Sequence, residues 1–186
     1  TVGRPQDRIA FEGLEHLSLD NLNRHLRRAV AKLKTMGVKD FKTFAVIEVH
    51  LVVPLEGEPY WEPHFHAIVS GATAEQLKDA FKVRKLAATD CRKRPLHVQP
   101  VTDLAGAIGY CLKFQSSKQV QYRSDSSVNT SRNNLTGEPL LDWYDFMATT
   151  PRSELMKFIG INADALNKHL TCELSLNVSE IPRGWL

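Results

Sequence analysis

The sequence predicts an α+β protein with a central antiparallel β-sheet, flanking helices and a small C-terminal helical appendage. Two β-branched, apolar segments lie close together, at 43–53 and 64–70, with a polar segment between them. Segments with helical periodicity precede and follow this pair. The 186 residues are 42% hydrophobic and 24% charged, which is typical of a globular chain that can bury a full core.

The first helix is predicted from Ser18 or Asp20, either of which is a good cap, to a stop at Gly37. Its apolar residues recur with helical spacing at Leu22, Leu26, Val30 and Leu33. Basic side chains lie off that stripe, at Arg24, Arg27, Arg28 and Lys32. Basic helix faces are common on protein surfaces, so a solvated face and a nucleic-acid contact are equally open interpretations.

A β-hairpin follows the first helix. Residues 43–53 read Thr-Phe-Ala-Val-Ile-Glu-Val-His-Leu-Val-Val and predict a buried strand. Residues 54–62 contain Gly57, Pro59 and three acids and predict a loop. The returning strand is predicted over 64–70.

The remaining elements are shorter. We predict a helix over 74–86, a basic turn at 92–94, a short strand over 96–99 and a helix over 104–114. Residues 115–137 are rich in Ser, Asn and Gln and predict a mobile loop or linker. Three short helices are then predicted at 139–148, 151–159 and 162–170. The chain thus divides into a domain at 1–114, a linker at 115–137 and an appendage at 138–186.

The net charge of +3 conceals basic blocks. Basic residues outnumber acidic ones by seven to two in 18–42, by seven to two in 78–94 and by four to one in 113–132. These blocks total +13, so the rest of the chain totals −10. Such segregation suggests a polyanion-binding surface beside a site that gathers carboxylates.

Composition excludes several classes. The three cysteines form no Cys-x-x-Cys motif, so neither a disulfide framework nor a thiolate zinc site is expected, and a reducing compartment fits best. No apolar run approaches the roughly 18 to 20 residues of a membrane span, and no charged-then-apolar leader opens the chain. Because the chain begins with Thr rather than Met, we expect it to be a piece of a longer protein.

The predicted hairpin carries a candidate metal site. His64 and His66 are two apart on a strand and share one face, with Phe65 on the other. Chance alone gives a His-x-His roughly a quarter of the time at this histidine content, so two ordinary surface histidines are the alternative. Glu48 and His50 on the neighbouring strand strengthen the metal interpretation, because cross-strand neighbours lie about 5 Å apart.

One carboxylate and two imidazoles suit Mg²⁺, Mn²⁺ or Zn²⁺ with positions left open for substrate oxygens. His50 is then either a supporting group or a fourth ligand. An acid of the loop remains an alternative to Glu48 as the third ligand, namely Glu56, Glu58 or Glu62.

A candidate nucleophile lies on the helix predicted over 104–114. Tyr110 and Lys113 are three apart, which places the hydroxyl and the ammonium side by side. A phenol, with a pKa of about 10, is a poor nucleophile until a cation stabilises the phenolate. Without the histidines, this pair indicates packing more often than catalysis. We expect Gly106 and Gly109 to let this helix approach the sheet closely.

Together these motifs resemble the HUH endonuclease superfamily. The matching segments are Glu48-Val49-His50, Pro63-His64-Phe65-His66 and Tyr110-x-x-Lys113, and the resemblance covers about 18–114. The histidines precede the tyrosine, as in the rolling-circle replication initiators, the Rep proteins of plasmids and of small single-stranded DNA viruses. One tyrosine occupies the motif, which is similar to the single-tyrosine class.

The resemblance implies a ferredoxin- or RRM-like fold and a defined mechanism. Glu48, His64 and His66 would hold Mg²⁺ or Mn²⁺, with Zn²⁺ possible in a crystal. Tyr110 would attack the scissile phosphate of single-stranded DNA, giving a 5′-phosphotyrosine and a 3′-OH that primes replication. Lys113 would orient the phosphate or lower the pKa of the phenol.

The resemblance also implies partners and a location. The partner would be single-stranded or hairpin DNA at a replication origin, held by the first helix and by Arg92, Lys93 and Arg94. A host helicase or a fused helicase domain would assist, and no membrane is involved. The location would be the cytoplasm of a bacterial or archaeal host, or the nucleus for a eukaryotic virus. Alternatives are an HUH transposase or relaxase, a non-catalytic DNA-binding module, and a hydrolase that activates water.

Overall fold

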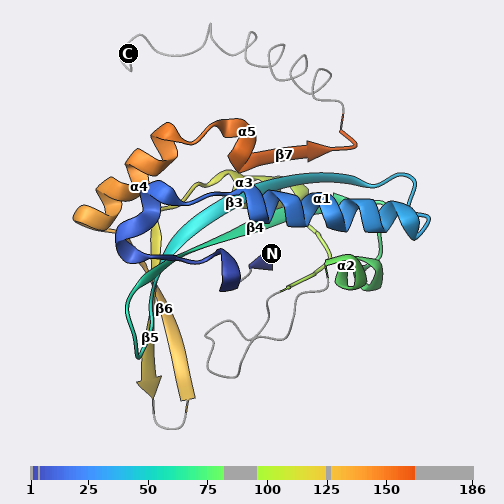
Figure 1. Ribbon diagram of the computed structural model, residues 1–186. Coiled ribbons are helices and arrows are strands. Elements are labelled where there is room, and N and C mark those ends of the chain that lie inside the picture. Colours follow the sequence, from blue (N-terminus) through green and yellow to red (C-terminus); the bar gives the residue numbers. More distant parts are fainter. Residues whose placement is uncertain (1, 4, 82–95, 125–126, 162–186) are drawn as a thin grey trace, which may run out of the picture.

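The computed structural model describes residues 2–3, 5–81, 96–124 and 127–161, and shows a mixed β-sheet flanked by helices (Figure 1). The α+β fold class is thereby confirmed. The strands are β1 (Val2–Gly3), β2 (Ile9–Ala10), β3 (Lys42–Val53), β4 (Tyr60–Ser70), β5 (Ser117–Ser124), β6 (Ser127–Asn134) and β7 (Met156–Ile159). The helices are α1 (Asp20–Thr35), α2 (Ala74–Phe81), α3 (Leu104–Leu112), α4 (Glu138–Thr149) and α5 (Arg152–Leu155), with 3-10 turns η1 (Pro5–Asp7) and η2 (Phe11–His16).

The long antiparallel pair β3–β4 is the centre of the fold and confirms the predicted hairpin. Strand β4 begins earlier than predicted, at Tyr60, and its outer edge pairs with β1 and β2. Gly71 ends β4 with a φ of 84°, where a Cβ would meet the Asp40 carbonyl oxygen at 2.3 Å. Only glycine fits this turn without strain, because it combines a left-handed conformation with a close backbone approach.

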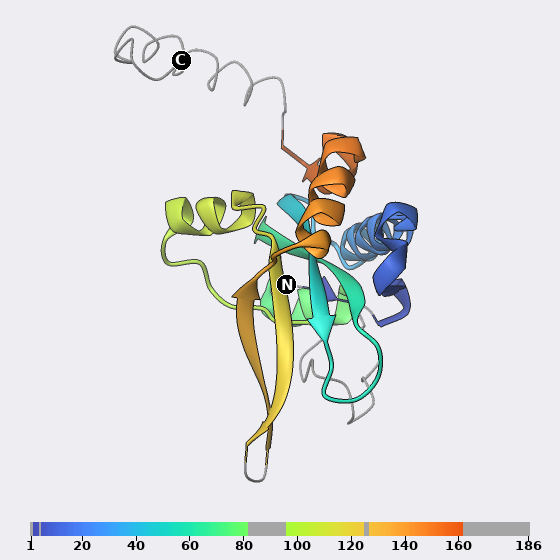
Figure 2. The same cartoon turned by 90° about the vertical axis from the view of Figure 1, so that its left-hand side faces the viewer.

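Helices α1 and α2 cover the apolar face of this hairpin, and α3 lies on the other side of the sheet (Figure 2). The predicted stripe of α1 is buried, together with Phe65 and Trp61 of β4. The Trp61 indole also donates a hydrogen bond of 2.8 Å to the Phe11 carbonyl. Removing a buried aromatic ring of this kind costs about 3 to 5 kcal/mol, so this layer supports the geometry of the hairpin.

The far edge of β3 is shared by two strands. Strand β7 pairs antiparallel with Thr43–Val46, and β5 pairs in parallel with Leu51–Val53. Between them, the Trp143 indole donates to the Val49 carbonyl at 3.2 Å, which satisfies an acceptor that neither strand reaches. The sheet is therefore mixed rather than purely antiparallel.

The predicted division of the chain after residue 114 needs correction. Residues 117–124 and 127–134 form the antiparallel pair β5–β6 rather than a loop or linker. This two-stranded β5–β6 ribbon projects beyond the rest of the sheet (Figures 1 and 2). Its side chains can be polar, because strands pair through backbone hydrogen bonds and the projecting part covers no core. Residues 138–159 are not a separate appendage, since Trp143 and Phe146 of α4 join the main core and β7 joins the sheet.

Two shorter predictions also change. Of the strand predicted over 96–99, Leu96 alone forms a bridge, to Val2. The helix predicted over 151–159 is helical only in α5, because 156–159 finds a strand partner in β3. Three further predictions lie outside the described residues, namely the end of the helix over 74–86, the turn at 92–94 and the helix over 162–170. None of the helices in the described part of the chain has the length and apolar character of a membrane span.

Candidate metal centre and nucleophile

The register of β3 and β4 places the predicted ligands together. Glu48 lies directly opposite His64, and Val46 lies opposite His66. Since side chains alternate along a strand, the carboxylate and both imidazoles project from the face opposite Phe65. The hairpin thus gathers the three groups by backbone pairing alone.

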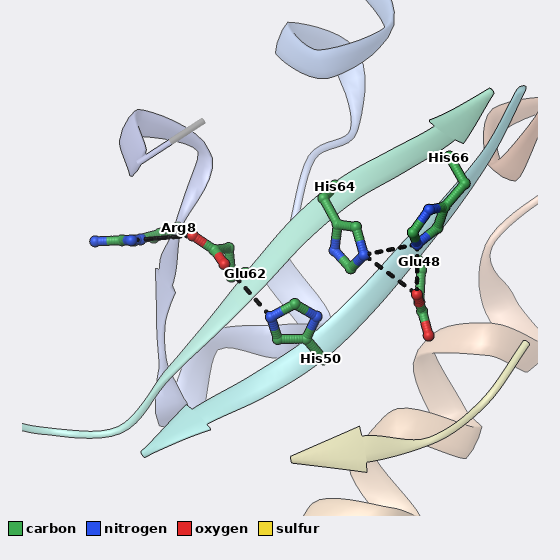
Figure 3. A network of polar contacts seen from close by, with 6 residues as sticks. All are labelled: Arg8, Glu48, His50, Glu62, His64 and His66. Carbon is green, nitrogen blue, oxygen red and sulfur yellow. Dashed lines mark hydrogen bonds and ion pairs between the residues drawn. The ribbon is translucent and has the colours of Figure 1, made fainter. Parts of the chain in front are cut away.

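Three ligand-type atoms converge on this face (Figure 3). Glu48 Oε2 lies 2.9 Å from His66 Nε2 and 3.2 Å from His64 Nε2, and the two nitrogens are 3.0 Å apart. Two bonds of about 2.1 Å at a right angle place their ligand atoms about 3.0 Å apart, so one cation can contact all three atoms. Glu48, His64 and His66 therefore form a group that can hold a metal ion.

The electrostatics of the triad favour a charged carboxylate. The three side chains are buried. Burial raises the pKa of Glu48, but hydrogen bonds from His64 and His66 and the positive charge on these rings outweigh it and hold the pKa well below its usual range. Glu48 Oε1 accepts no hydrogen bond within the described structure, and Lys113 Nζ lies 3.9 Å from it. One carboxylate oxygen thus remains available to a ligand.

Helix α3 brings the predicted nucleophile to the triad. The Tyr110 ring meets the His66 ring edge-on, with centroids 4.9 Å apart and an interplanar angle of 90°. Lys113 Nζ lies over the Tyr110 ring, 3.9 Å from its centroid, so the two side chains are neighbours through the ring face. Tyr110 is 45% exposed, which leaves it accessible to a large substrate.

The ends of α3 fix the position of these residues. Asp103 caps the helix by accepting a hydrogen bond of 3.0 Å from the Gly106 amide. Phe114 follows with a φ of 37°, a conformation that aromatic residues rarely adopt, and turns the chain towards β5. The expected role of the glycines is wrong: the atoms nearest to a Cβ at Gly106 belong to the capping Asp103, and a Cβ at Gly109 would meet nothing within 4 Å beyond its own helix backbone. The buried contact of α3 is Cys111.

A second carboxylate–histidine pair lies one step along the same face (Figure 3). His50 is opposite Glu62, with 3.4 Å between Nε2 and Oε2, and both side chains are almost fully buried. Arg8 donates from Nε and Nη2 to Glu62 Oε1 at 3.1 and 3.0 Å. The His50 and His64 rings lie 4.6 Å apart. This second cluster of Arg8, Glu62 and His50 thus packs directly against a triad ligand.

The alternatives for the third ligand are resolved by these contacts. Glu62 is engaged by Arg8 and His50. Glu56 and Glu58 are exposed in the loop between β3 and β4. Glu48 is therefore the carboxylate of the triad, and His50 occupies the supporting position.

The predicted DNA-contact residues do not surround the triad. Helix α1, which carries Arg24, Arg27 and Arg28, lies on the opposite face of the sheet (Figure 2). Lys32 is engaged by α2, where Nζ lies 2.9 Å from Asp79 Oδ2. Arg92, Lys93 and Arg94 lie outside the described residues.

An open cleft of about 740 Å³ adjoins the triad. His66 and Tyr110 are among its lining residues, together with residues of α2, α3 and the segment 96–103. This cleft and Arg8 were not predicted from the sequence. No local signal reveals Arg8, because 54 positions separate it from Glu62.

The arrangement combines three ingredients of phosphoryl transfer. A triad that can hold a metal ion, a phenol and an ammonium group share one side of the sheet. Comparison of the chain with known protein families, with curated proteins and with solved structures gives no match.

Proposed function

We propose that the protein is a metal-dependent endonuclease that nicks and joins single-stranded DNA through a tyrosine nucleophile and thereby initiates rolling-circle replication. One observation carries the proposal: the exposed Tyr110 packs against His66 of the triad and beside Lys113. Tyr110 and His66 both line the open cleft. Lys113 lies beside Tyr110, and Glu48 and His64 lie beside His66.

The metal we propose is Mg²⁺ or Mn²⁺. The residues fit such an ion, because one carboxylate and two imidazoles converge and Glu48 Oε1 accepts no hydrogen bond from a described residue. Glu48, His64 and His66 would hold the ion. When bound, it would polarise the scissile phosphate and stabilise the charge that develops on the phosphate oxygens.

The reaction is a transesterification. The Tyr110 oxygen attacks phosphorus, the bond from phosphorus to the 3′ oxygen breaks, and the phenolic proton is transferred to the leaving 3′ oxygen. Lys113 stabilises the negative charge that develops on the phenol oxygen and orients the phosphate. The products are a 5′-phosphotyrosine and a free 3′-OH. Attack by a 3′-OH reverses the step, so joining requires no ATP.

The test uses single-stranded DNA with an origin-like sequence and Mn²⁺. The 3′ fragment carries the 5′-phosphate, so a 3′-terminal label is expected to remain on the protein, whereas a 5′-terminal label leaves on a fragment that a polymerase can extend. Tyr110→Phe removes the adduct. Tyr122→Phe is the matched control, because Tyr122 is similarly exposed, at 46%, on β5. His64→Ala abolishes cleavage and keeps most DNA binding.

Two outcomes would contradict this function. Cleavage without an adduct indicates a hydrolase that activates water. Binding without cleavage, in the presence of Mn²⁺, indicates a DNA-binding module. An adduct that survives in Tyr110→Phe also excludes the assigned nucleophile.

A further inference from the structure

The β5–β6 ribbon projects beyond the body of the protein (Figures 1 and 2). Only Lys118–Val120 pairs with β3, and each strand of the ribbon has 8 residues. At about 3.3 Å per residue the ribbon extends about 26 Å. Most of this length packs against no other strand in the described structure. Such an extension is not needed to complete the core.

One face of the ribbon continues the face of the metal-binding triad. Val52 and Glu48 lie on the same face of β3, because every second residue of a strand points to the same side of the sheet. Gln119 of β5 is paired with Val52, so Gln119 lies on that face too. Arg132 of β6 is paired with Gln119 and shares its face. Arg123 lies four residues after Gln119 on β5, so it also points to that face. The register therefore places Arg123 and Arg132 on the triad's face of the sheet.

The charge of this ribbon suits a polyanion. Within 117–134 the sequence has Lys118, Arg123 and Arg132 against the single acid Asp125, a net charge of +2. Both arginines are exposed, and neither forms an ion pair with a carboxylate among the described residues. The neighbouring side chains are mainly Gln, Asn, Ser and Thr, which hydrogen-bond to base edges and phosphates.

We propose that the β5–β6 ribbon binds duplex DNA in the major groove, beside the single strand that enters the cleft. The proposal rests on the proposed function, since it takes DNA as the substrate. A major groove about 12 Å wide admits a two-stranded ribbon, whereas the deep, narrow major groove of duplex RNA does not. Arg123 and Arg132 contact the DNA, and the junction between duplex and single strand lies near the triad.

The experiment compares two pairs of charge-removing substitutions in the full chain. Arg123→Gln with Arg132→Gln alters the ribbon, and Arg24→Gln with Arg28→Gln removes the same charge from α1 on the opposite face. Fluorescence anisotropy measures the binding of each protein to a duplex with a single-stranded tail and to the single strand alone. Adduct formation on the single strand is measured in parallel.

The ribbon variant is expected to bind the tailed duplex at least about tenfold more weakly. The plot of the logarithm of its binding constant against the logarithm of the salt concentration should be less steep, by the contribution of about two phosphate contacts. The α1 variant keeps its duplex affinity, both variants keep adduct formation on the single strand, and duplex RNA does not compete. Equal losses in both variants, an unchanged duplex affinity in the ribbon variant, or competition by duplex RNA would each overturn the proposal.

Two further results separate the possible failures. If the wild type forms an adduct but the ribbon variant binds duplex normally, this inference fails and the proposed function stands. If no DNA gives an adduct, the proposed function fails whatever the ribbon binds. A wild-type dimer that the ribbon substitutions dissociate, with duplex affinity unchanged, would assign the edge of β6 to a second copy of the chain and overturn the DNA assignment.

Discussion

Two carboxylate–histidine pairs occupy consecutive steps on one face of the β3–β4 hairpin, yet their surroundings differ. Glu48 faces His64, and His50 faces Glu62. Arg8 reaches the second pair and donates twice to Glu62. At Glu48, Lys113 Nζ lies 3.9 Å from Oε1, and that oxygen accepts no hydrogen bond from a described residue. The same residue types thus form a closed ion pair in one place and an open ligand set in the other.

The difference teaches that neighbouring elements, rather than residue types, decide which pair is available for chemistry. The N-terminal segment covers Glu62, whereas α3 leaves the triad beside a cleft. His64 joins the two clusters, because its ring packs on His50 at 4.6 Å and on His66 at 4.8 Å. The closed cluster therefore supports the open one.

The largest effect is expected from removing a triad ligand. His66→Ala should weaken Mn²⁺ binding by more than about 100-fold, as measured by titration calorimetry. Loss of a group that only hydrogen-bonds to a metal ligand costs up to about 100-fold, and loss of a ligand should cost more. The matched control is His16→Ala, because His16 is exposed on η2. Equal Mn²⁺ affinity in His66→Ala and the control would exclude the triad as the metal site.

A smaller effect is expected in the closed cluster. Glu62→Gln keeps the side-chain shape but removes the charge that Arg8 and His50 face. We expect a loss of about 1.5 to 3 kcal/mol in the free energy of unfolding, measured with urea. Mn²⁺ affinity should fall by about 10- to 100-fold, as for an outer partner. Glu58→Gln in the exposed loop is the control, and a loss of Mn²⁺ affinity as large as in His66→Ala would make Glu62 a ligand.

The Arg8–Glu62 contact is expected to show a measurable coupling. A double-mutant cycle with Arg8→Gln and Glu62→Gln should give an interaction energy of about 1 kcal/mol in urea unfolding. The value is limited because the Arg8 side chain is 21% exposed and partly screened by water. Additive effects of the two substitutions would show that Arg8 contributes no pairing energy.

Sequence reasoning predicted the features that depend on local periodicity. The β-branched segments at 43–53 and 64–70 indicate strands, and the period of two places His64 and His66 on one face. The cross-strand position of Glu48 follows once the hairpin is assumed. The triad was therefore predictable in outline.

Other features depend on partners that are distant in the sequence. The guanidinium of Arg8 meets Glu62 across 54 positions, a pairing that no local pattern encodes. Strand β5 was mistaken for a linker because its solvated ribbon lacks a continuous apolar face, although Val120 and Tyr122 do alternate with polar residues. The sequence predicts a helix where β7 lies, because a pattern over four residues is too short to distinguish a strand from a helix turn.

The smallest effect is expected at Lys113, and its sign separates a cation of the open site from a structural partner. Lys113→Met removes a positive charge that lies 3.9 Å from Glu48 Oε1 on a side chain that is 24% exposed. Mn²⁺ should then bind about two- to fivefold more tightly, because the repulsion between Lys113 and the metal ion is lost and is as weak as that of other partly exposed charges. Adduct formation should nevertheless slow, since the charge that develops on the Tyr110 oxygen loses the cation that lies over the tyrosine ring. Lys34→Met on α1 is the control. Weaker Mn²⁺ binding in Lys113→Met would show that Lys113 holds Glu48 in position and does not compete with the metal.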